Sequence, residues 1–198
     1  FYYLFDSQTG KLLKQHIHRF APKEKKLILT AQQSSKSDFE NLIPSAIHIT
    51  AHNNILLLFE YNWESIMLIR DRQGMLYDRP YYYANEILLF QFDANGTLCN
   101  SIVIPKKQAL GADPEVLGFH SFLSDNKLWL LYNDHPKNRN QPNGGKLKTM
   151  KGKHEMMMGE YDIFLKRFSK RPFGLTSRVS GFKPQRITEV NGSSLLFF

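Results

Sequence analysis

An internal repeat of strand-like segments constrains the fold of this chain more than any other feature. The polar segment 48–54 runs into the apolar segment 55–59, and 72 residues later the similar segment 120–126 runs into 127–131. A second match pairs residues 85–92 with residues 161–168, at an offset of 76. A period in the seventies that is made of β segments predicts stacked β units.

The composition agrees with a β-rich domain. The chain has 198 residues, of which 42% are hydrophobic, and this is enough for one ordinary core. Fifteen Phe and nine Tyr suit the pleated surfaces of sheets. Few segments keep the apolar spacing of a helix, whereas short alternating or wholly apolar runs are common. The sequence therefore predicts an all-β protein.

Three similar turns punctuate the apolar runs, at residues 6–10, 71–74 and 93–96. Each begins with an Asp that can accept hydrogen bonds from the turn backbone. Each ends with a Gly that can adopt positive φ next to a β-bulge. We interpret them as hairpin turns, and their carboxylates as structural groups, because a calcium loop needs many more oxygen ligands.

The repeat predicts four antiparallel strands in each copy, which is the arrangement of a β-propeller blade. In the first copy the expected strands are 48–51, 55–61, 87–92 and 98–104, and in the second they are 119–123, 128–133, 163–168 and 175–180. The segments 1–5 and 12–17 match the last two strands of a blade, whereas 186–190 and 194–198 match the first two. We also expect an edge strand at 26–31 and a loop at 34–38.

The predicted fold is thus a β-propeller-like array of four-stranded antiparallel blades, with two full copies and two terminal half-blades in one domain of residues 1–198. Its parts are a half-blade with a linker at 1–45, blades at 46–106 and 107–183, and a half-blade at 184–198. This makes about three blades, whereas propellers have four to eight. Because the chain begins and ends within apolar runs, we interpret it as a processed chain or as a fragment of a longer one that forms a larger propeller. The missing blades then come from a longer chain or from another chain; an open β array is the alternative.

The chain is basic, with 26 Lys and Arg against 18 Asp and Glu and a formal charge of +8. This favours anionic partners, but the basic residues are scattered, which argues against nucleic acid. The single cysteine, Cys99, lies in a strand-like run, where we expect a packed thiol rather than a nucleophile. No apolar run approaches the roughly 18 residues of a transmembrane helix.

Two connections are long, at residues 62–85 and 134–161. In an up-and-down blade both emerge on one face, beside the connection 105–118, and long loops on rigid scaffolds often carry function. The first loop combines aromatic rings with guanidinium groups, a pattern that suits contacts with sugars, peptides or nucleic-acid bases. The candidate ligand-binding residues are Trp63, Arg70, Arg72, Arg79, Tyr81, Tyr82, Tyr83 and His135. The alternative is that residues 66–77 form a hairpin of their own, with the tyrosines covering apolar surface.

The sequence lacks the motifs of common catalytic sites. It has no Gly-x-Ser-x-Gly turn and no phosphate-binding glycine loop. His48 and His120 occupy equivalent positions of the repeat, but no acidic or cysteine residue joins them at ligand spacing, so we expect packing or hydrogen-bonding roles rather than a metal site. We predict no cofactor and no metal. Carboxylates that pair in space, as in glycosidases, leave no motif.

One stretch resembles a known group of proteins. Tyr81–Ile87 is followed by a turn at Phe92–Gly96 and by Ile102–Gln108, and then by Lys127–Asn138. This pattern resembles the propeller-like repeat proteins of bacterial cell envelopes, over roughly residues 46–198. The resemblance implies a secreted or envelope location and no particular reaction. The second copy departs from the pattern at 169–174, where the Asp-x-x-Gly turn is replaced.

From these observations we expect a non-enzymatic binding or scaffolding module of a bacterial envelope or secreted protein. It would contact a protein or a glycan, of anionic character, through the long loops. The alternative hypothesis is a glycan-active propeller enzyme with a carboxylate pair on the same face.

Overall fold

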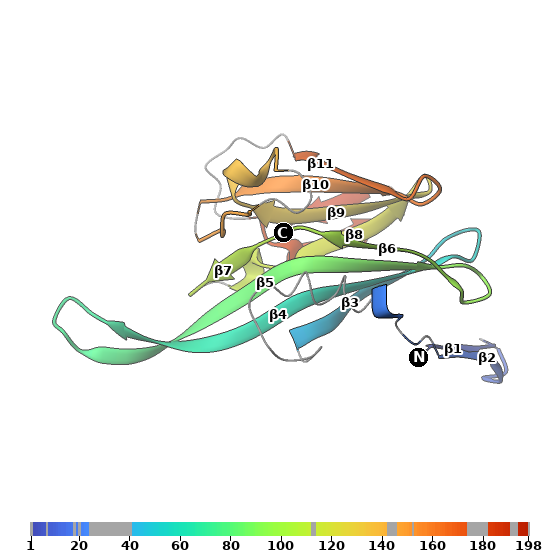
Figure 1. Ribbon diagram of the computed structural model, residues 1–198, viewed down its shortest axis with the longest axis horizontal. Helices are drawn as coiled ribbons and strands as arrows, with labels where there is room; N and C mark the ends of the chain where they lie inside the picture. The colour runs from blue at the N-terminus through green and yellow to red at the C-terminus, as the bar shows by residue number, and fades with distance from the viewer. Residues whose placement is uncertain are drawn as a thin grey trace.

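The structure is a computed structural model and describes residues 2–6, 8–17, 19, 21–23, 41–111, 114–141, 146–151, 153–173, 182–190 and 194–197. It confirms an all-β protein, built on two antiparallel sheets of five and four strands that pack against each other (Figure 1). Among the described residues, nothing closes these sheets into a ring, so the propeller is not part of what the structure shows.

The five-stranded sheet, called sheet 1 here, contains β3 (Leu42–Ile49), β4 (Ile55–Arg70), β5 (Leu76–Phe92), β6 (Leu98–Ile104) and β7 (Gln108–Leu110). The first four are neighbours in sequence order, and β7 pairs with β5 beyond the end of β6. The four-stranded sheet, sheet 2, contains β8 (Phe119–Ser124), β9 (Lys127–Asp134), β10 (Glu155–Asp162) and β11 (Arg167–Pro172), also neighbours in sequence order.

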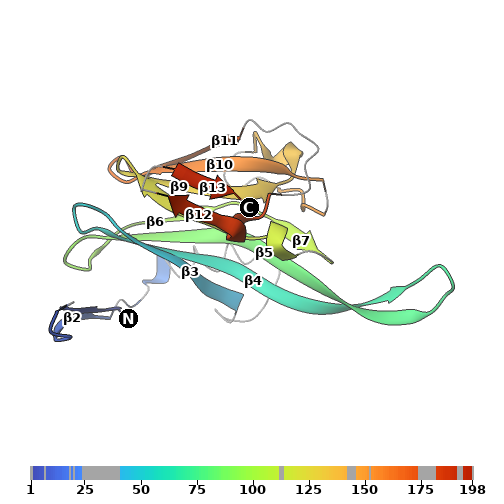
Figure 2. The same cartoon turned by 180° about the vertical axis from the view of Figure 1, so that it is seen from behind.

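Two separate hairpins lie near the chain ends. They are β1 (Tyr2–Phe5) with β2 (Leu12–His16), and β12 (Ile187–Val190) with β13 (Ser194–Phe197). Both terminal strand pairs were predicted from the repeat, and both are confirmed. Figure 2 shows β12 and β13 on the side of sheet 2. Within the described residues, the short 3-10 helices η2 (Pro114–Val116), η3 (Pro136–Asn138) and η4 (Pro184–Arg186) connect strands.

The core lies between the two sheets. Alternate residues of β4 and β5, such as Leu58 and Leu89, meet alternate residues of β9 and β10, such as Leu130 and Met157. Burial of these side chains provides the main driving force for the packing of the sheets. A hydrogen bond of 2.8 Å between His48 Nε2 and Ser121 Oγ also joins the sheets. This contact agrees with the hydrogen-bonding role expected for His48.

The opposite face of sheet 1 is apolar as well. Its buried residues are Tyr61, Leu88, Phe90 and Phe92, and half-buried side chains such as Phe59 pack around them. In the body of the molecule β4 and β5 are therefore nearly continuous apolar runs, as expected for strands that are buried on both faces. Of the described residues, no helix is long and apolar enough to span a membrane.

The three predicted Asp–Gly turns are confirmed. The Oδ1 atom of Asp71 accepts hydrogen bonds from the backbone N–H groups of Gln73 and Met75, both at 2.9 Å. Asp93 accepts the equivalent two bonds in its own turn, and Asp6 accepts bonds from the backbone N–H groups of Gln8 and Thr9. The closing glycines have φ angles of 67°, 87° and 83° at positions 10, 74 and 96, a region that glycine enters without steric cost.

Two predicted strand positions are wrong. Residues 163–166 form a turn rather than part of a strand, because Asp162 Oδ1 accepts hydrogen bonds from the backbone N–H groups of Phe164 and Leu165. The third strand of the second copy is therefore β10, which ends at Asp162. The first strand of the first copy, expected at 48–51, is β3 and ends at Ile49, because Thr50 begins a turn and accepts a bond from the N–H of Asn54.

Cys99 is exposed, not packed as expected. The pairing of β5 with β6 shifts register there, since Gln91 faces Asn100 and Phe92 faces Leu98. Cys99 is the extra residue of this bulge and does not follow the inward alternation of the strand. The segments 26–31, 34–38 and 175–180 lie outside the described residues.

Candidate functional site

The most prominent feature of the surface is an arm formed by the distal halves of β4 and β5. The two strands pair from Glu64 with Tyr82 to Arg70 with Leu76 and extend beyond the rest of both sheets (Figure 1). We call residues 64–82 the arm. The connection 62–85, expected as a loop, is therefore mostly strand. The alternative expectation of a hairpin at 66–77 is correct.

The pairing register assigns each arm residue to one of two faces, because side chains alternate along a strand. The inner face continues the side of sheet 1 that packs on sheet 2, and the outer face continues the opposite side. The inner face carries Glu64, Ile66, Leu68, Arg70, Leu76, Asp78, Pro80 and Tyr82, and the outer face carries Ser65, Met67, Ile69, Tyr77, Arg79 and Tyr81. Trp63 and Tyr83 extend the outer face at the base of the arm.

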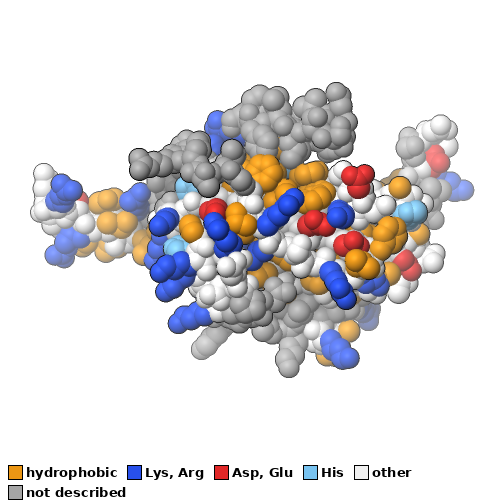
Figure 3. Space-filling model, turned by 90° about the horizontal axis from the view of Figure 1, so that it is seen from above, with side chains coloured by type: hydrophobic (Ala, Val, Ile, Leu, Met, Phe, Trp, Pro, Cys, Tyr) orange, Lys and Arg blue, Asp and Glu red, His pale blue; other side chains and the backbone are white. Residues whose placement is uncertain are grey.

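Both faces of the arm expose large apolar side chains. On the inner face Ile66, Leu68 and Leu76 are 71%, 64% and 53% exposed. On the outer face Met67 and Tyr77 are 43% and 45% exposed. Figure 3 shows hydrophobic side chains along the arm, with basic side chains at its tip. Soluble monomers rarely expose contiguous apolar patches of this kind unless the patch binds something.

The arm is neutral, although the chain is strongly basic. Residues 64–82 contain three arginines, at positions 70, 72 and 79, and three acidic residues, at positions 64, 71 and 78. Three positive charges minus three negative charges gives zero, so the whole formal charge of +8 lies outside the arm. The expected anionic character of a partner thus finds no support in the charge of the arm.

Aromatic rings stack along the base of the outer face. The rings of Trp63 and Tyr83 are almost parallel, with centroids 4.6 Å apart, and the ring of Tyr81 lies 5.2 Å from that of Tyr83. Arg79 Nε donates a hydrogen bond of 2.8 Å to the carbonyl of Gly111, just beyond β7. These contacts attach the base of the arm to the body.

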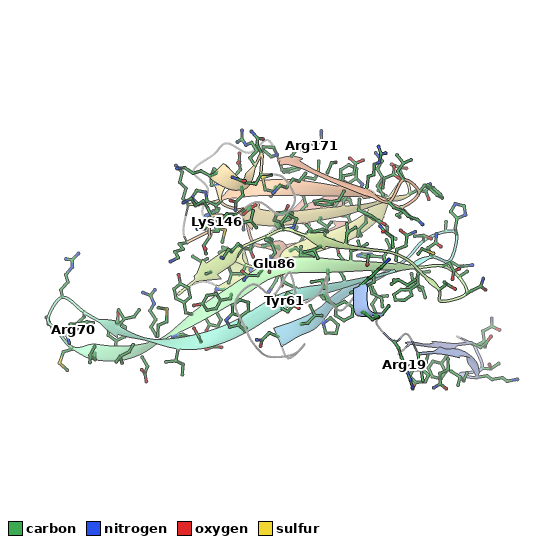
Figure 4. All side chains as sticks on the ribbon, in the orientation of Figure 1. Arg19, Tyr61, Arg70, Glu86, Lys146 and Arg171 are labelled. Carbon is green, nitrogen blue, oxygen red and sulfur yellow. The ribbon has the colours of Figure 1, made fainter. Side chains whose placement is uncertain are left out.

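The structure brings together four of the eight predicted ligand-binding residues: Trp63, Arg79, Tyr81 and Tyr83. Tyr82 points to the inner face, where it packs in a cluster with Val116 and Met150. Arg70 lies at the end of β4 near the arm tip (Figure 4), and Arg72 lies in the turn. His135 follows the end of β9, in the other sheet's β9–β10 connection, where its Nδ1 accepts a bond from the N–H of Lys137 and caps η3.

Three long connections, at residues 62–85, 105–118 and 134–161, lie at the end of the molecule from which the arm extends. The strand β7 pairs with β5 at the base of the arm. The backbone of Met150, from the β9–β10 connection, exchanges hydrogen bonds with Ala109 and Lys107, at 3.0 and 2.9 Å. The expected gathering of these connections at one end of the scaffold is thus what Figure 1 shows.

A buried polar network lies near the base of the arm, and no motif in the sequence predicts it. The side chain of Lys106 is fully buried and donates hydrogen bonds to Glu60 Oε1 at 2.5 Å, Gln108 Oε1 at 2.8 Å and the carbonyl of Ala84 at 3.1 Å. Gln108 Nε2 continues the network to the carbonyl of Asn133 at 2.6 Å. Burial lowers the pKa of Lys106, and the Glu60 carboxylate acts in the opposite direction.

A second buried carboxylate, Asp134, lies at the end of β9. Its Oδ1 accepts bonds from Asn138 Nδ2 at 2.7 Å and from the N–H of His135 at 2.8 Å, and its Oδ2 lies 3.8 Å from Lys170 Nζ. Burial raises the pKa of Asp134 and lowers that of Lys170. These bonds hold η3 against the end of β9 and do not leave the carboxylate facing a cleft.

Glu86 lies at the bulge where the pairing of β4 with β5 shifts between Glu60 and Asn62, and Figure 4 labels it above Tyr61. Burial raises the pKa of Glu86 to about 7, and the positive charges of Lys106 and Lys107 act in the opposite direction. Burial and the nearby Glu86 raise the pKa of Tyr61 to about 12.

In the part of the chain that the structure describes, no group of three or more His, Cys, Asp or Glu residues could hold a metal ion. No protein family model, no curated protein and no solved structure matches this chain.

Proposed function

We propose that this protein is a non-enzymatic binding module that contacts a protein partner through the outer face of the arm. The observation that carries the proposal is the set of apolar side chains exposed on a ribbon that projects from the body. An isolated two-stranded ribbon is marginal in water, and a partner that covers it would bury these side chains.

The arrangement of the rings favours a protein over a glycan. A sugar stacks on the open face of an aromatic ring, but the stacked rings of Trp63 and Tyr83 each cover one face of the other, and the ring of Tyr81 lies close to that of Tyr83. The side chains that remain exposed farther along the face, Met67 and Tyr77, are of types that are enriched in the cores of protein interfaces.

The carboxylates near the base of the arm give little support to the alternative of a glycan-active enzyme. Glycosidase mechanisms need two carboxyl groups that flank a cleft. Glu60 is instead held by Lys106, and Asp134 is held by Asn138 and a backbone N–H group. Both carboxylates are buried and serve contacts within the fold.

The scaffold we propose is a propeller-like array. Each sheet contains four antiparallel strands that are neighbours in sequence order, β3 to β6 and β8 to β11, and the two sets pack face to face. The terminal hairpins, β1–β2 and β12–β13, would each be half of a further blade. A secreted or envelope location remains part of the proposal through the resemblance alone.

The proposal can be tested by selecting ligands against the arm. A peptide display library and a glycan array are both screened against the full chain and against an armless chain, in which an Asn-Gly turn joins Ser65 to Tyr81. We expect the armless chain to keep the body folded, because the apolar residues removed are mostly exposed. Circular dichroism and thermal unfolding check this control.

We expect peptides that bind the full chain, do not bind the armless chain, and bind at least about tenfold more weakly to Met67→Ala or Tyr77→Ala variants. Glycans that require Tyr81 and Tyr83 would instead show that the partner is a sugar. If neither screen yields a ligand that depends on the arm, the binding function proposed here is wrong.

A further inference from the structure

We propose that the inner face of the arm is a self-complementary interface, and that its occupant is a second copy of this chain. This inference uses the face opposite to the one assigned above to a protein partner. It therefore stands on its own observations and has its own test.

On the β4 half of the inner face, the order of side chains is complementary to itself when one copy of the strand is reversed. From the base of the arm to its tip the order is Glu64, Ile66, Leu68 and Arg70. A negative charge thus lies at one end and a positive charge at the other, with two exposed aliphatic residues between them.

Two copies of this strand can pack face to face in antiparallel orientation about a twofold axis next to Met67. Ile66 of each copy then lies opposite Leu68 of the other, and Glu64 of each copy lies opposite Arg70 of the other. One contact surface therefore forms two aliphatic pairs and two ion pairs with itself. This is what an isologous dimer interface requires.

The charges at the two ends are available for such pairs. Within the described residues, neither Glu64 nor Arg70 forms an ion pair, and both are exposed. On β5 of the same chain, Leu76 lies across from Arg70 and Tyr82 lies across from Glu64. Neither charge therefore has an opposite charge directly across its own ribbon.

The distribution of charge over the molecule favours contact at the arm. The arm is neutral, whereas the rest of the chain carries the full +8. Antiparallel arms place the two bodies at opposite ends of a ribbon of about 20 Å, since each strand residue adds roughly 3.4 Å. This separation is about two and a half Debye lengths at physiological salt, where the Debye length is about 8 Å, so repulsion between the bodies is largely screened.

A lipid surface is a poorer occupant for the same face. The turn that would enter the bilayer first carries Arg70, Asp71 and Arg72, and charged side chains are costly in the hydrocarbon region. Apolar residues also lie on both sides of the ribbon rather than on one, whereas a segment that lies in a membrane interface is apolar on one side only.

Sedimentation velocity of the full chain over a range of concentrations tests the inference by charge exchange. The wild-type chain should dimerise. E64R and R70E should each weaken the dimer roughly tenfold, because each places like charges opposite each other at two symmetric positions. The double variant E64R/R70E should restore the affinity, since it exchanges both partners of each pair.

Two further variants complete the experiment. R72E makes the same change of charge in the turn, off the inner face, and should dimerise like the wild type. L68D places a charge in the aliphatic centre and should abolish the dimer while leaving the circular dichroism spectrum unchanged.

The inference is wrong if the wild-type chain stays monomeric up to roughly 100 µM, where even a micromolar interface would associate, or if the double variant is no better than the single ones. Binding of the monomer to lipid vesicles that L68D removes would also overturn it. None of these results predicts how Met67→Ala and Tyr77→Ala, on the outer face, change the binding of peptides. The function proposed above is therefore tested separately from the dimer.

Discussion

Lys106 is the residue on which the buried polar network depends. Its ammonium group joins β4, through Glu60, to β5, through the carbonyl of Ala84, and to β7, through Gln108. All of these groups are buried, so none can exchange its protein partner for water. A buried ion pair adds little net stability compared with apolar residues, but breaking it by removing one partner is costly.

We therefore expect Lys106→Met to lower the free energy of unfolding by about 3–5 kcal/mol, because it leaves the Glu60 carboxylate buried without a cation. The double variant Glu60→Gln/Lys106→Met should cost less than Lys106→Met alone. Urea unfolding measures all three proteins.

A matched control for Lys106 is Lys127, whose Nζ lies 2.6 Å from Glu160 Oε1 while the two side chains are 37% and 29% exposed. Lys127→Met should lower the free energy of unfolding much less than Lys106→Met, because the loss of an exposed ion pair costs little. Equal losses for the buried and the half-exposed lysine would show that the network does not hold the sheet as described.

Glu86 should make stability depend on pH. Its pKa in the folded protein is about 7, raised from 4.5, chiefly by burial. Between these two values the unfolded chain has lost the proton while the folded protein still holds it. Stability should therefore fall as pH rises through this window and change little above it on account of this group.

The variant Glu86→Gln cannot ionise and isolates this contribution from that of the other buried acids. We expect its free energy of unfolding, relative to the wild type, to increase from pH 4.5 to about pH 7 and then to level off. Chemical unfolding of both proteins at a series of pH values measures the difference. A difference that stays constant across the series would show that Glu86 does not titrate in this window.

At the scale of the elements, local signals were predicted well and long-range ones were not. The turns that begin at Asp6, Asp71 and Asp93 were predictable because the carboxylate and the glycine act within a few residues. The strand at 163–168 was misplaced because Ile163 is buried and apolar although it lies in a turn. Hydrophobicity alone does not separate a buried turn from a strand.

In the candidate site, too, the local features of the arm were predictable from the sequence and its long-range contacts were not. Its length and its aromatic and arginine residues were visible in the sequence, but its two faces depend on a register that the turn at Asp71 and the bulge near Glu86 fix together. The contacts of Lys106 were not predictable, since they join residues 60, 84, 106 and 108 across three strands. The separation of Tyr82 from Tyr81 and Tyr83 follows from simple alternation along β5.

At the scale of the whole molecule, the two sheets share one core and should unfold together. The cluster between them draws on β4, β5 and β6 of sheet 1 and on β9 and β10 of sheet 2. Tyr161 of sheet 2 also donates a hydrogen bond of 2.6 Å to Gln91 Oε1 of sheet 1 and accepts one of 2.9 Å from Asn100 Nδ2. Neither sheet can bury its inner face without the other.

We therefore expect a cavity in sheet 2 to destabilise sheet 1 equally. Leu130 is fully buried on β9 within the shared core, and Leu130→Ala should cost about 2–5 kcal/mol. Native-state hydrogen exchange should show the same loss of protection for the central residues of β4 and β5 as for those of β9 and β10. The arm, which lies outside the core, should exchange faster than the body in both proteins. If β4 and β5 keep their protection while β9 and β10 lose it, the sheets are separate folding units, and the single shared core inferred here is wrong.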